Sequence, residues 1–370
     1  MTARRLPATL GAILALVLLS CLGPARADIR IATFAAELYR DGPGILVRDL
    51  ADGRDPAVEA TVEILATVAP DILVLTRIDH DADLVALGLL RDRLKASGLD
   101  YPHVFAAEPN SGMATGVDLD GDGRLGTPRD AQGYGRFRGA RGMAILSRFP
   151  ILRDRVRDFS ALLWKDLPGD GLDPPPFPSA AARAVQRLSS TGHWIVPIAV
   201  DERHVLNVLA FAATAPVFDG PEDRNGIRNR DEIRLWTRVL DGLAPDGQPL
   251  TEPFVIAGLA NLDPFDGEGR HDAIRQLLAH PRLQDPKPKS EGGAAQAQKG
   301  ASAHRGDPAL DTASWPGEGP GALRVDYVLP SAELRVTGSG VFWPTEGPGA
   351  RAARLASAHR LVWVDVAFPD

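Results

Sequence analysis

Short apolar runs of strand length recur along this chain of 370 residues. Most of them are bounded by Gly, Pro, Asp or Ser, and the chain contains 37 glycines and 31 prolines. Such punctuation predicts many short strands joined by long loops. The runs lie at 29–34, 72–75, 143–146, 194–200, 205–211, 254–258, 325–329, 341–343 and 361–368.

Helical patterns are fewer than strand patterns, and they lie at 57–69, 83–97, 222–243 and 271–278. The sequence has no internal repeat and no change of composition that would mark a second domain. We therefore expect one α/β domain over 28–370, with two sheets packed face to face and helices outside. The stretch 286–322 is rich in Pro, Gly, Ala and Ser, which predicts a flexible loop.

The N-terminus has the pattern of a secretory signal peptide covering residues 1–27. Arg4 and Arg5 precede an apolar run at 10–19, and Ala25 and Ala27 stand at the −3 and −1 positions of a cleavage site. An apolar run of about ten residues is too short to span a bilayer. The mature chain is then periplasmic or secreted, without a transmembrane segment.

A second interpretation of the N-terminus is a lipoprotein signal. The residues 18–21 resemble a lipobox, in which Cys21 would be lipidated and become the new N-terminus. The strand-like run starts directly after Ala27, which leaves little tether, so we favour simple export. Because Cys21 is the only cysteine, the chain cannot form an internal disulfide.

The net charge limits the kinds of partner that this chain can bind. The formal charge is −7, and removal of residues 1–27 takes away three arginines and no acidic residue, which gives −10. An acidic balance argues against general nucleic-acid coating, which needs a basic surface, although it leaves a local nucleic-acid contact open. The length allows one large core, and we expect a monomer.

Several strand patterns end in polar or small residues, in a recognisable order. The motifs are Thr33-Phe34-Ala35, Ala69-Pro70-Asp71-Ile72-Leu73, the segment 142–151, Gly258 with Asn261, the segment 324–329, and His359-Arg360 before the last run. In this order and spacing the chain resembles the endonuclease/exonuclease/phosphatase family, which has the DNase-I-like fold. The resemblance extends from about residue 29 to residue 368.

The resemblance implies a four-layered α/β sandwich, with two packed mixed β-sheets flanked by helices. It also implies hydrolysis of a phosphoester substrate with Mg²⁺ or Mn²⁺. On the matching motifs, His359 corresponds to the catalytic His and Asp326 to the Asp that orients it. Asn261 corresponds to the Asn that holds the reacting phosphate.

Five other family positions are replaced in this chain. Ala35 stands at the place of an Asn, Arg77 at that of the metal-binding Glu, and Ala212 at that of a His. Leu259 replaces the Asp thought to activate the nucleophile, and Ala358 replaces the Asp before the last His. Because Mg²⁺ needs oxygen ligands, these replacements predict weak or lost hydrolysis.

The replacements leave alternatives to catalysis. One is a non-catalytic protein that binds phosphate or a partner on the same fold, with Arg77 and Arg136 as phosphate ligands. Arg136 belongs to the basic and aromatic segment 134–141, whose bland interpretation is an ordinary arginine-rich loop. A displaced metal site at 79–81 is a third possibility, although such runs are more often solvated.

An Asp-rich loop suggests a separate metal. Asp118, Asp120 and Asp122 alternate with other residues around Gly121, as in a calcium loop, and Asp130 follows. An EF-hand needs Glu at the twelfth position, where this chain has Arg129. The loop is therefore either a structural Ca²⁺ turn or a solvated Asp-Gly turn.

Overall fold

The structure is a computed structural model that describes residues 28–167, 177–251, 253–296, 304–315 and 319–369. The expected signal peptide and Cys21 lie outside the described residues. Among the residues that are described, no helix is both long enough and apolar enough to cross a membrane.

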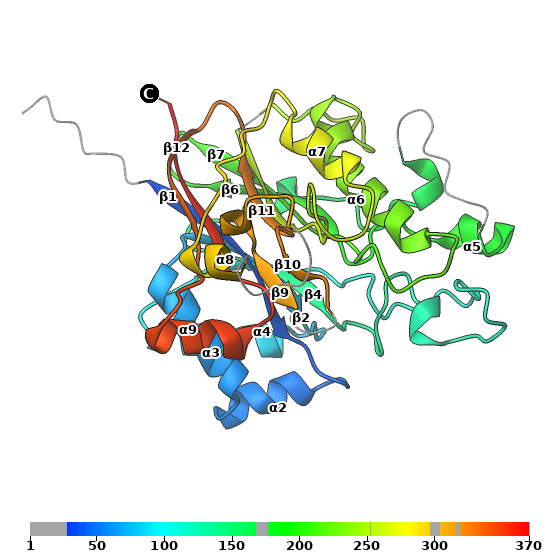
Figure 1. Ribbon diagram of the computed structural model, residues 1–370, viewed down its shortest axis with the longest axis horizontal. Helices are drawn as coiled ribbons and strands as arrows, with labels where there is room; N and C mark the ends of the chain where they lie inside the picture. The colour runs from blue at the N-terminus through cyan, green and yellow to red at the C-terminus, as the bar shows by residue number, and fades with distance from the viewer. Residues whose placement is uncertain (1–27, 168–176, 252, 297–303, 316–318, 370) are drawn as a thin grey trace, which may run out of the picture.

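Two mixed sheets form the centre of the molecule (Figure 1). The six-stranded sheet has the order β12-β13-β1-β2-β4-β3, with β1 Ile29–Leu38, β2 Ile72–Ile78, β3 His103–Phe105, β4 Gly142–Ser147, β12 Arg335–Val341 and β13 Val362–Ala367. The five-stranded sheet has the order β11-β8-β7-β6-β5, with β5 Arg157–Asp158, β6 His193–Ala199, β7 Val205–Ala212, β8 Phe254–Leu259 and β11 Asp326–Pro330. A small two-stranded sheet joins β9 Ala313–Trp315 to β10 Gly321–Leu323.

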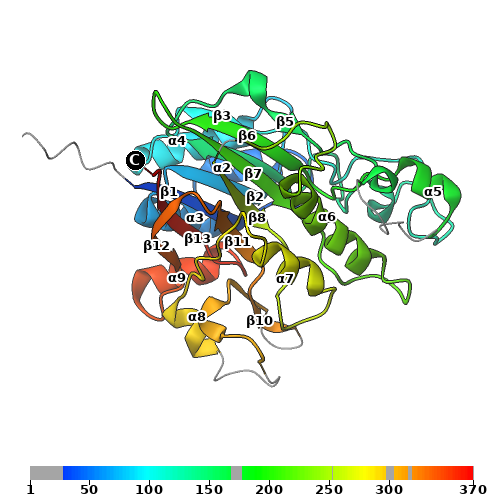
Figure 2. The same cartoon turned by 90° about the horizontal axis from the view of Figure 1, so that it is seen from above.

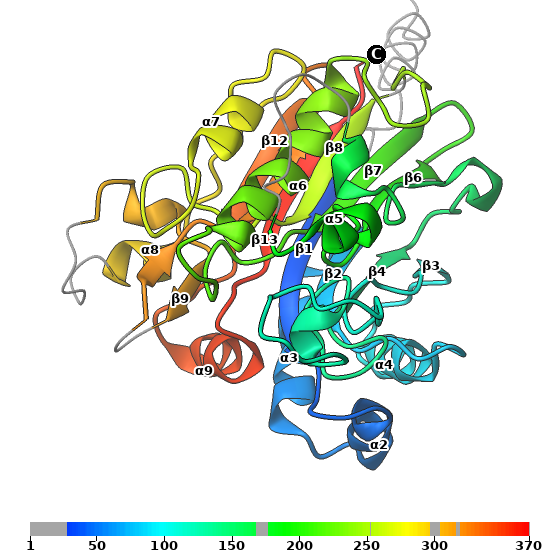
Figure 3. The same ribbon diagram turned by 90° about the vertical axis from the view of Figure 1, so that its right-hand side faces the viewer.

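Helices cover the outer face of each sheet. The six-stranded sheet packs against α2 Ile45–Asp52, α3 Pro56–Val68, α4 Val85–Ala96 and α9 Gly347–Ala356. The five-stranded sheet packs against α6 Arg224–Leu240 and α7 Asp272–Leu278, and α6 lies along its face in Figure 3. The remaining helices are α5 Ala180–Val185, α8 Glu291–Gln296 and the 3-10 turns η1 Pro128–Asp130, η2 Arg153–Arg155, η3 Trp164–Asp166 and η4 Pro308–Leu310.

Three apolar cores hold these layers together. One lies between the two sheets, a second between the six-stranded sheet and its helices, and a third between the five-stranded sheet and α6 and α7. This arrangement is the expected four-layered α/β sandwich, so the fold-class prediction is confirmed. The insertion 109–141 and α5 extend together from one side of the sandwich, as Figures 1 and 2 show.

The helix α3 shows how local sequence sets an element. Its N-cap Asp55 accepts hydrogen bonds from the backbone N–H groups of Ala57 and Val58, and Pro56 occupies the first turn, where no partner for its nitrogen is needed. The helix ends at Ala69, which adopts a left-handed conformation directly before Pro70. The capping residues thus place both ends within one residue of the expected segment 57–69.

The structure differs from the expected segments at some single elements. The expected strand at 341–343 is instead the end of β12, which runs back to Arg335 and ends at Val341. The segment 286–322, expected to be a flexible loop, contains α8, η4 and β9 in its described parts and the start of β10. The sequence patterns also missed α2, α5 and α9, which are short or contain glycine and gain stability from packing that local patterns do not report.

Candidate functional site

Sheet topology brings the family positions to one end of the sandwich. In the five-stranded sheet, Leu259 pairs with Ala212 on one side and with Asp326 on the other. In the six-stranded sheet, Ala35 lies on β1 beside the strand β2 that carries Arg77. The strand β1 in turn packs against β8 and β11 of the other sheet. Positions scattered along the sequence therefore meet between the two sheets.

The close packing of two strands explains why the motif that contains Asn261 has a glycine at position 258. Gly258 has φ +155°, and a Cβ atom added there would lie 2.0 Å from the carbonyl oxygen of Phe211 on the neighbouring strand. Only glycine allows this approach of β7 and β8. Gly258 thus allows β8, which leads to Leu259 and Asn261, to lie close to β7.

His359 and Asp326 form a buried pair. The imidazole Nδ1 lies 2.9 Å from Asp326 Oδ2, and both side chains are 0% exposed. Thr312 donates its hydroxyl to the same carboxylate oxygen at 2.9 Å and accepts the backbone N–H of Asp326. The other carboxylate oxygen, Oδ1, is buried without a hydrogen-bond partner among the described residues.

Arg77 occupies the other side of the imidazole. Its Nη1 lies 3.0 Å from His359 Nε2, and a guanidinium can only donate, so Nε2 is the acceptor. The proton of the neutral ring is therefore on Nδ1, which donates it to Asp326. The result is a continuous hydrogen-bonded chain from Arg77 through His359 to Asp326, with no free nitrogen left on the imidazole.

The backbone around Arg77 is irregular, and this irregularity sets the direction of the Arg77 side chain. The pairing of β1 with β2 shifts register between Ala35 and Leu38, and that of β2 with β4 shifts between Thr76 and Ile78. Such bulges redirect the side chain of the extra residue. The bulges place Arg77 3.7 Å from Glu37, and the Arg77 guanidinium lies 3.5 Å from the Tyr39 hydroxyl.

Three replaced positions have become part of the apolar core between the sheets. Ala35, Ala212 and Leu259 are 0%, 4% and 3% exposed and belong to the same cluster of packed side chains. None of them offers an oxygen, and Ala358 offers none from its side chain. The residues present at the family site therefore do not fit a divalent cation, because the expected ligands are apolar and a guanidinium stands beside them.

The residues 312–315 close one side of this site. Ser314 donates its backbone N–H to the Ala358 carbonyl, Arg360 donates its own to the Thr312 carbonyl, and Ala313 pairs with His359 in strand fashion. The Trp315 ring lies edge-on to the imidazole, with 5.2 Å between ring centres. This segment was not predicted as a partner of His359, since nothing in its local sequence marks the pairing.

Asn261 is present but already engaged. Its side-chain amide donates to the carbonyl oxygen of Ala213 at 2.7 Å, and its backbone has φ +53°. Left-handed backbone at non-glycine residues also occurs at Glu37, Arg77 and Arg141, at a cost of about 1–2 kcal/mol each. Strain of this kind gathers at functional sites, where surrounding structure supports it.

Among the described residues, the segment 79–81, considered as a displaced metal site, does not contribute to a cluster of three candidate metal ligands. The two carboxylate oxygens of Asp79 accept the backbone N–H groups of Arg40 and Arg141, and Asp81 caps α4 through Val85 and Ala86. Burial lowers the pKa of His80, which favours its neutral form. The carboxylates of Asp79 and Asp81 thus already have structural partners, which does not favour a metal site in this segment.

The Asp-rich loop brings three of its four predicted residues together. Asp118, Asp120 and Asp130 each place a carboxylate oxygen within 4.8 Å of the others, whereas Asp122 lies outside this group. Burial and neighbouring carboxylates raise the pKa of Asp120, and backbone hydrogen bonds, led by that of Gly123, lower the pKa of Asp118. Across the described part of the chain this is the one group with the donor set of a metal site.

Arg136 lies at the surface, where it pairs with Asp41. Nearby in the same segment, Arg141 contacts the rings of Tyr39 and Tyr134. The basic and aromatic pattern of the segment 134–141 predicts Arg136 as the phosphate ligand and gives no sign of Tyr39. The only available signal for Tyr39 was its position directly after the first strand.

Comparisons with known proteins agree with this fold. Residues 47–359 match the model of the Endonuclease/Exonuclease/phosphatase family. The chain belongs to this family. Its members act on phosphoester substrates and typically depend on a divalent metal. No curated protein sequence matches the chain.

Several solved structures are similar to this chain at low sequence identity. An endonuclease/exonuclease/phosphatase of Beutenbergia cavernae is 19% identical with a TM-score of 0.54, over 93% of this chain and 72% of that one. A family protein of Leptotrichia buccalis is 13% identical with a TM-score of 0.49, over 92% and 100%. The human nocturnin catalytic domain is 13% identical with a TM-score of 0.49, over 92% and 95%. The first of these shows the fold of the chain.

Proposed function

We propose that this protein binds a phosphate-bearing ligand at the family site and has lost hydrolysis. The observation that carries the proposal is the contact of Arg77 with His359. The guanidinium engages Nε2, the imidazole nitrogen that a general acid or base would present to the substrate. His359 is thus held as a neutral link between Arg77 and Asp326.

Loss of metal-dependent chemistry is supported by the packing around this link. The positions that the resemblance assigns to metal ligands and to the nucleophile activator are apolar or cationic. Leu259 pairs with Asp326 in the sheet. An Asp at position 259 would place a second buried carboxylate beside that of Asp326, at a cost in desolvation. Each lost catalytic group typically lowers a rate by about 10²–10⁴-fold.

Retained phosphate binding is supported by Arg77 itself. A guanidinium offers five N–H donors in a planar fork that matches phosphate oxygens, and the contacts with His359 and Tyr39 leave part of that fork unused. The Arg77 side chain keeps partial exposure, at 22%, although His359 below it is buried. An anion can therefore reach Arg77 without entering the core.

We also propose that the protein is exported, since residues 1–27 have the charge, apolar run and cleavage pattern of a signal peptide. N-terminal sequencing of the protein from its native host tests this. A mature chain that starts at Asp28 supports cleavage after Ala27, and one that starts at a lipidated Cys21 supports the lipoprotein alternative. A chain that retains Met1 contradicts both.

The test of lost hydrolysis uses a chromogenic phosphodiester with Mg²⁺, Mn²⁺ or Ca²⁺. We expect no metal-dependent turnover by residues 28–370. A matched variant restores the family residues as Ala35→Asn, Arg77→Glu, Ala212→His, Leu259→Asp and Ala358→Asp, and circular dichroism checks that it is folded. Turnover by the unmodified protein that disappears in His359→Ala would overturn the proposal.

A further inference from the structure

A second arginine lies close to Arg77, held between two tyrosine rings. The guanidinium carbon of Arg141 lies 4.3 Å from the centre of the Tyr39 ring and 5.6 Å from that of the Tyr134 ring. The Arg77 guanidinium carbon lies 5.4 Å from the centre of the same Tyr39 ring. Two cations and two aromatic rings therefore form one cluster beside the imidazole.

The backbone that builds this cluster is fixed by a buried carboxylate. Asp79 accepts the N–H of Arg40, next to Tyr39, at 2.7 Å and the N–H of Arg141 at 3.0 Å. It thereby ties the end of the first strand to the residue that precedes β4. Arg141 itself has φ +54°, a conformation that a non-glycine residue holds only when its surroundings impose it.

The guanidinium of Arg141 differs from those of its neighbours in forming no direct ion pair among the described residues, although the Asp79 carboxylate acts on its charge through space. Within the same segment, Arg136 pairs with Asp41 and Arg138 pairs with Glu108. Among the described residues no carboxylate forms an ion pair with Arg141, and no acceptor takes a hydrogen bond from its side chain. Its N–H donors are therefore available to a ligand.

Stacking between rings also prepares this guanidinium for binding. Aromatic faces attract the cation and restrict its side-chain rotation, so less entropy is lost when a ligand binds. A guanidinium can form two parallel N–H bonds to an oxyanion. Tyr134 is 51% exposed, which leaves this part of the cluster open to solvent.

We propose that Arg141, clamped between Tyr39 and Tyr134, is the principal receptor for a tetrahedral oxyanion, a phosphate or a sulfate group. The inference rests on the proposed function, because Arg77 supplies the second positive charge on the Tyr39 ring. Tyr39, Tyr134 and Arg141 lie outside the set of catalytic positions that the family resemblance supplies. They add a binding subsite at the edge of the closed family site.

The test is isothermal titration calorimetry of the purified protein with inorganic phosphate and, separately, with sulfate at pH 8. The variants are Arg141→Gln, Arg141→Lys and Arg77→Gln, with Arg138→Gln as the matched control from the same segment. We expect Arg141→Gln to weaken phosphate binding about ten- to hundred-fold, since it removes a bidentate charged contact. Arg141→Lys should recover only part of the affinity because an ammonium offers no planar fork, and Arg138→Gln should bind as the unmodified protein does.

The comparison of phosphate with sulfate shows whether the site binds any tetrahedral dianion or only phosphate. Equal weakening for phosphate and sulfate supports a receptor for any tetrahedral dianion, and binding of phosphate alone supports a phosphate-specific one. Circular dichroism shows whether each variant is folded. If Arg141→Gln misfolds, the folded Arg141→Lys variant serves as the test, and its loss of affinity supports the receptor.

The outcomes distinguish this inference from the proposed function. Unchanged phosphate binding in Arg141→Gln, with loss in Arg77→Gln, overturns the Arg141 receptor and leaves the proposed function standing. Loss in Arg141→Gln alone supports the receptor and overturns the assignment of phosphate to Arg77. Absence of binding by the unmodified protein overturns both.

Discussion

The interior and the rim of the family site have opposite character. In the interior, Asp326 and His359 are fully buried, and the replaced positions Ala35, Ala212 and Leu259 belong to the apolar core between the sheets. At the rim, two arginines contact the ring of Tyr39, and one of them also contacts Tyr134. The positions that the family uses for metal chemistry are thus apolar, whereas the rim, where we propose that a ligand binds, is cationic and aromatic.

This contrast separates two requirements that an active family site combines. Metal-assisted hydrolysis needs carboxylates that are buried and properly spaced, and each loss is severe. Anion binding needs only oriented donors at an accessible surface. An interior that is ordinary apolar core is therefore compatible with the phosphate binding that we propose for the rim.

The largest expected effect is on stability, from His359→Ala. The change leaves the buried Asp326 carboxylate with only the Thr312 hydroxyl as a side-chain partner, which should lower the free energy of unfolding by about 3–5 kcal/mol. Arg141→Gln at the rim should change it by less than about 0.5 kcal/mol. Urea unfolding measures both, and a loss of under about 1 kcal/mol in His359→Ala would show that the interior pair is not structural.

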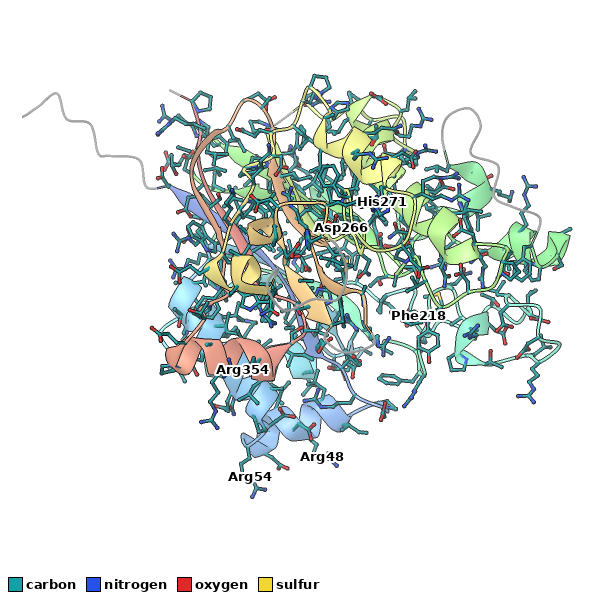
Figure 4. All side chains as sticks on the ribbon, viewed as in Figure 1. Arg48, Arg54, Phe218, Asp266, His271 and Arg354 are labelled. Atoms are coloured by element: carbon teal, nitrogen blue, oxygen red, sulfur yellow. The ribbon has the colours of Figure 1, made fainter. Side chains whose placement is uncertain are left out.

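The second prediction concerns the pH dependence of stability in the segment 304–311, which directly precedes residues 312–315. His304 lies 3.0 Å from Asp311 through Nε2 and 3.2 Å from Asp266 through Nδ1, and Asp266 is labelled in Figure 4. Burial, with Asp263 and Asp266 nearby, raises the pKa of Asp311 to about 7, while the two carboxylates raise the pKa of His304 against the effect of burial.

Both shifts have the same sign for stability. A pKa raised in the folded state means that the native protein binds the proton more tightly than the unfolded chain does. The free energy of unfolding should therefore fall as the pH rises from about 4 through about 7. Chemical unfolding at several pH values should show a shallower fall for Asp311→Asn, and an equally steep one would contradict the assignment.

The third prediction concerns the boundary between rim and interior. Arg77→Gln keeps a donor near His359 Nε2 but removes the charge, so phosphate affinity should fall about tenfold or more, with a small change in unfolding free energy. Calorimetry and urea unfolding of the same samples provide the comparison. A large loss of stability with unchanged affinity would place Arg77 with the interior.

The smallest expected effect is that of calcium on the Asp-rich loop. Its carboxylates already accept backbone N–H groups, as Asp118 does from Gly121 and Gly123, so the loop is held without an ion. For a millimolar site, 5 mM Ca²⁺ should stabilise the protein by about 1 kcal/mol. Thermal unfolding should show this shift in the native protein and not in Asp120→Asn, and its absence from both would identify a solvated turn.

Local sequence was a good guide where the local residues themselves carry the structure. The central strands and the helices α3, α4, α6 and α7 follow the expected segments because their apolar spacing matches the faces they bury. The helix α9 was missed because its Gly-Pro-Gly start disfavours a helix, and packing of Ala352 and Ala356 in the core beneath the sheet supplies the stability. The expected loop after residue 286 likewise gains regular structure through tertiary contacts.

The candidate site shows the same division. The family motifs identified His359, Asp326 and Asn261 and the replaced positions, since motifs are read in order along the chain. They did not show that Arg77 hydrogen-bonds the imidazole, because residues 282 positions apart meet only through sheet packing. They also did not select Arg141 over Arg136. That choice depends on which arginine forms an ion pair with a carboxylate in the folded protein.

The sequence by itself determined the family, the two-sheet sandwich and the loss of the expected metal ligands. Each of these depends on residue types and their order, which folding does not change. Only the tertiary structure decided that the residue replacing the metal-binding Glu is joined to His359 and that Arg141 lies unpaired between Tyr39 and Tyr134. Those facts depend on distances between distant segments, which β-bulges, buried carboxylates and close strand packing set together.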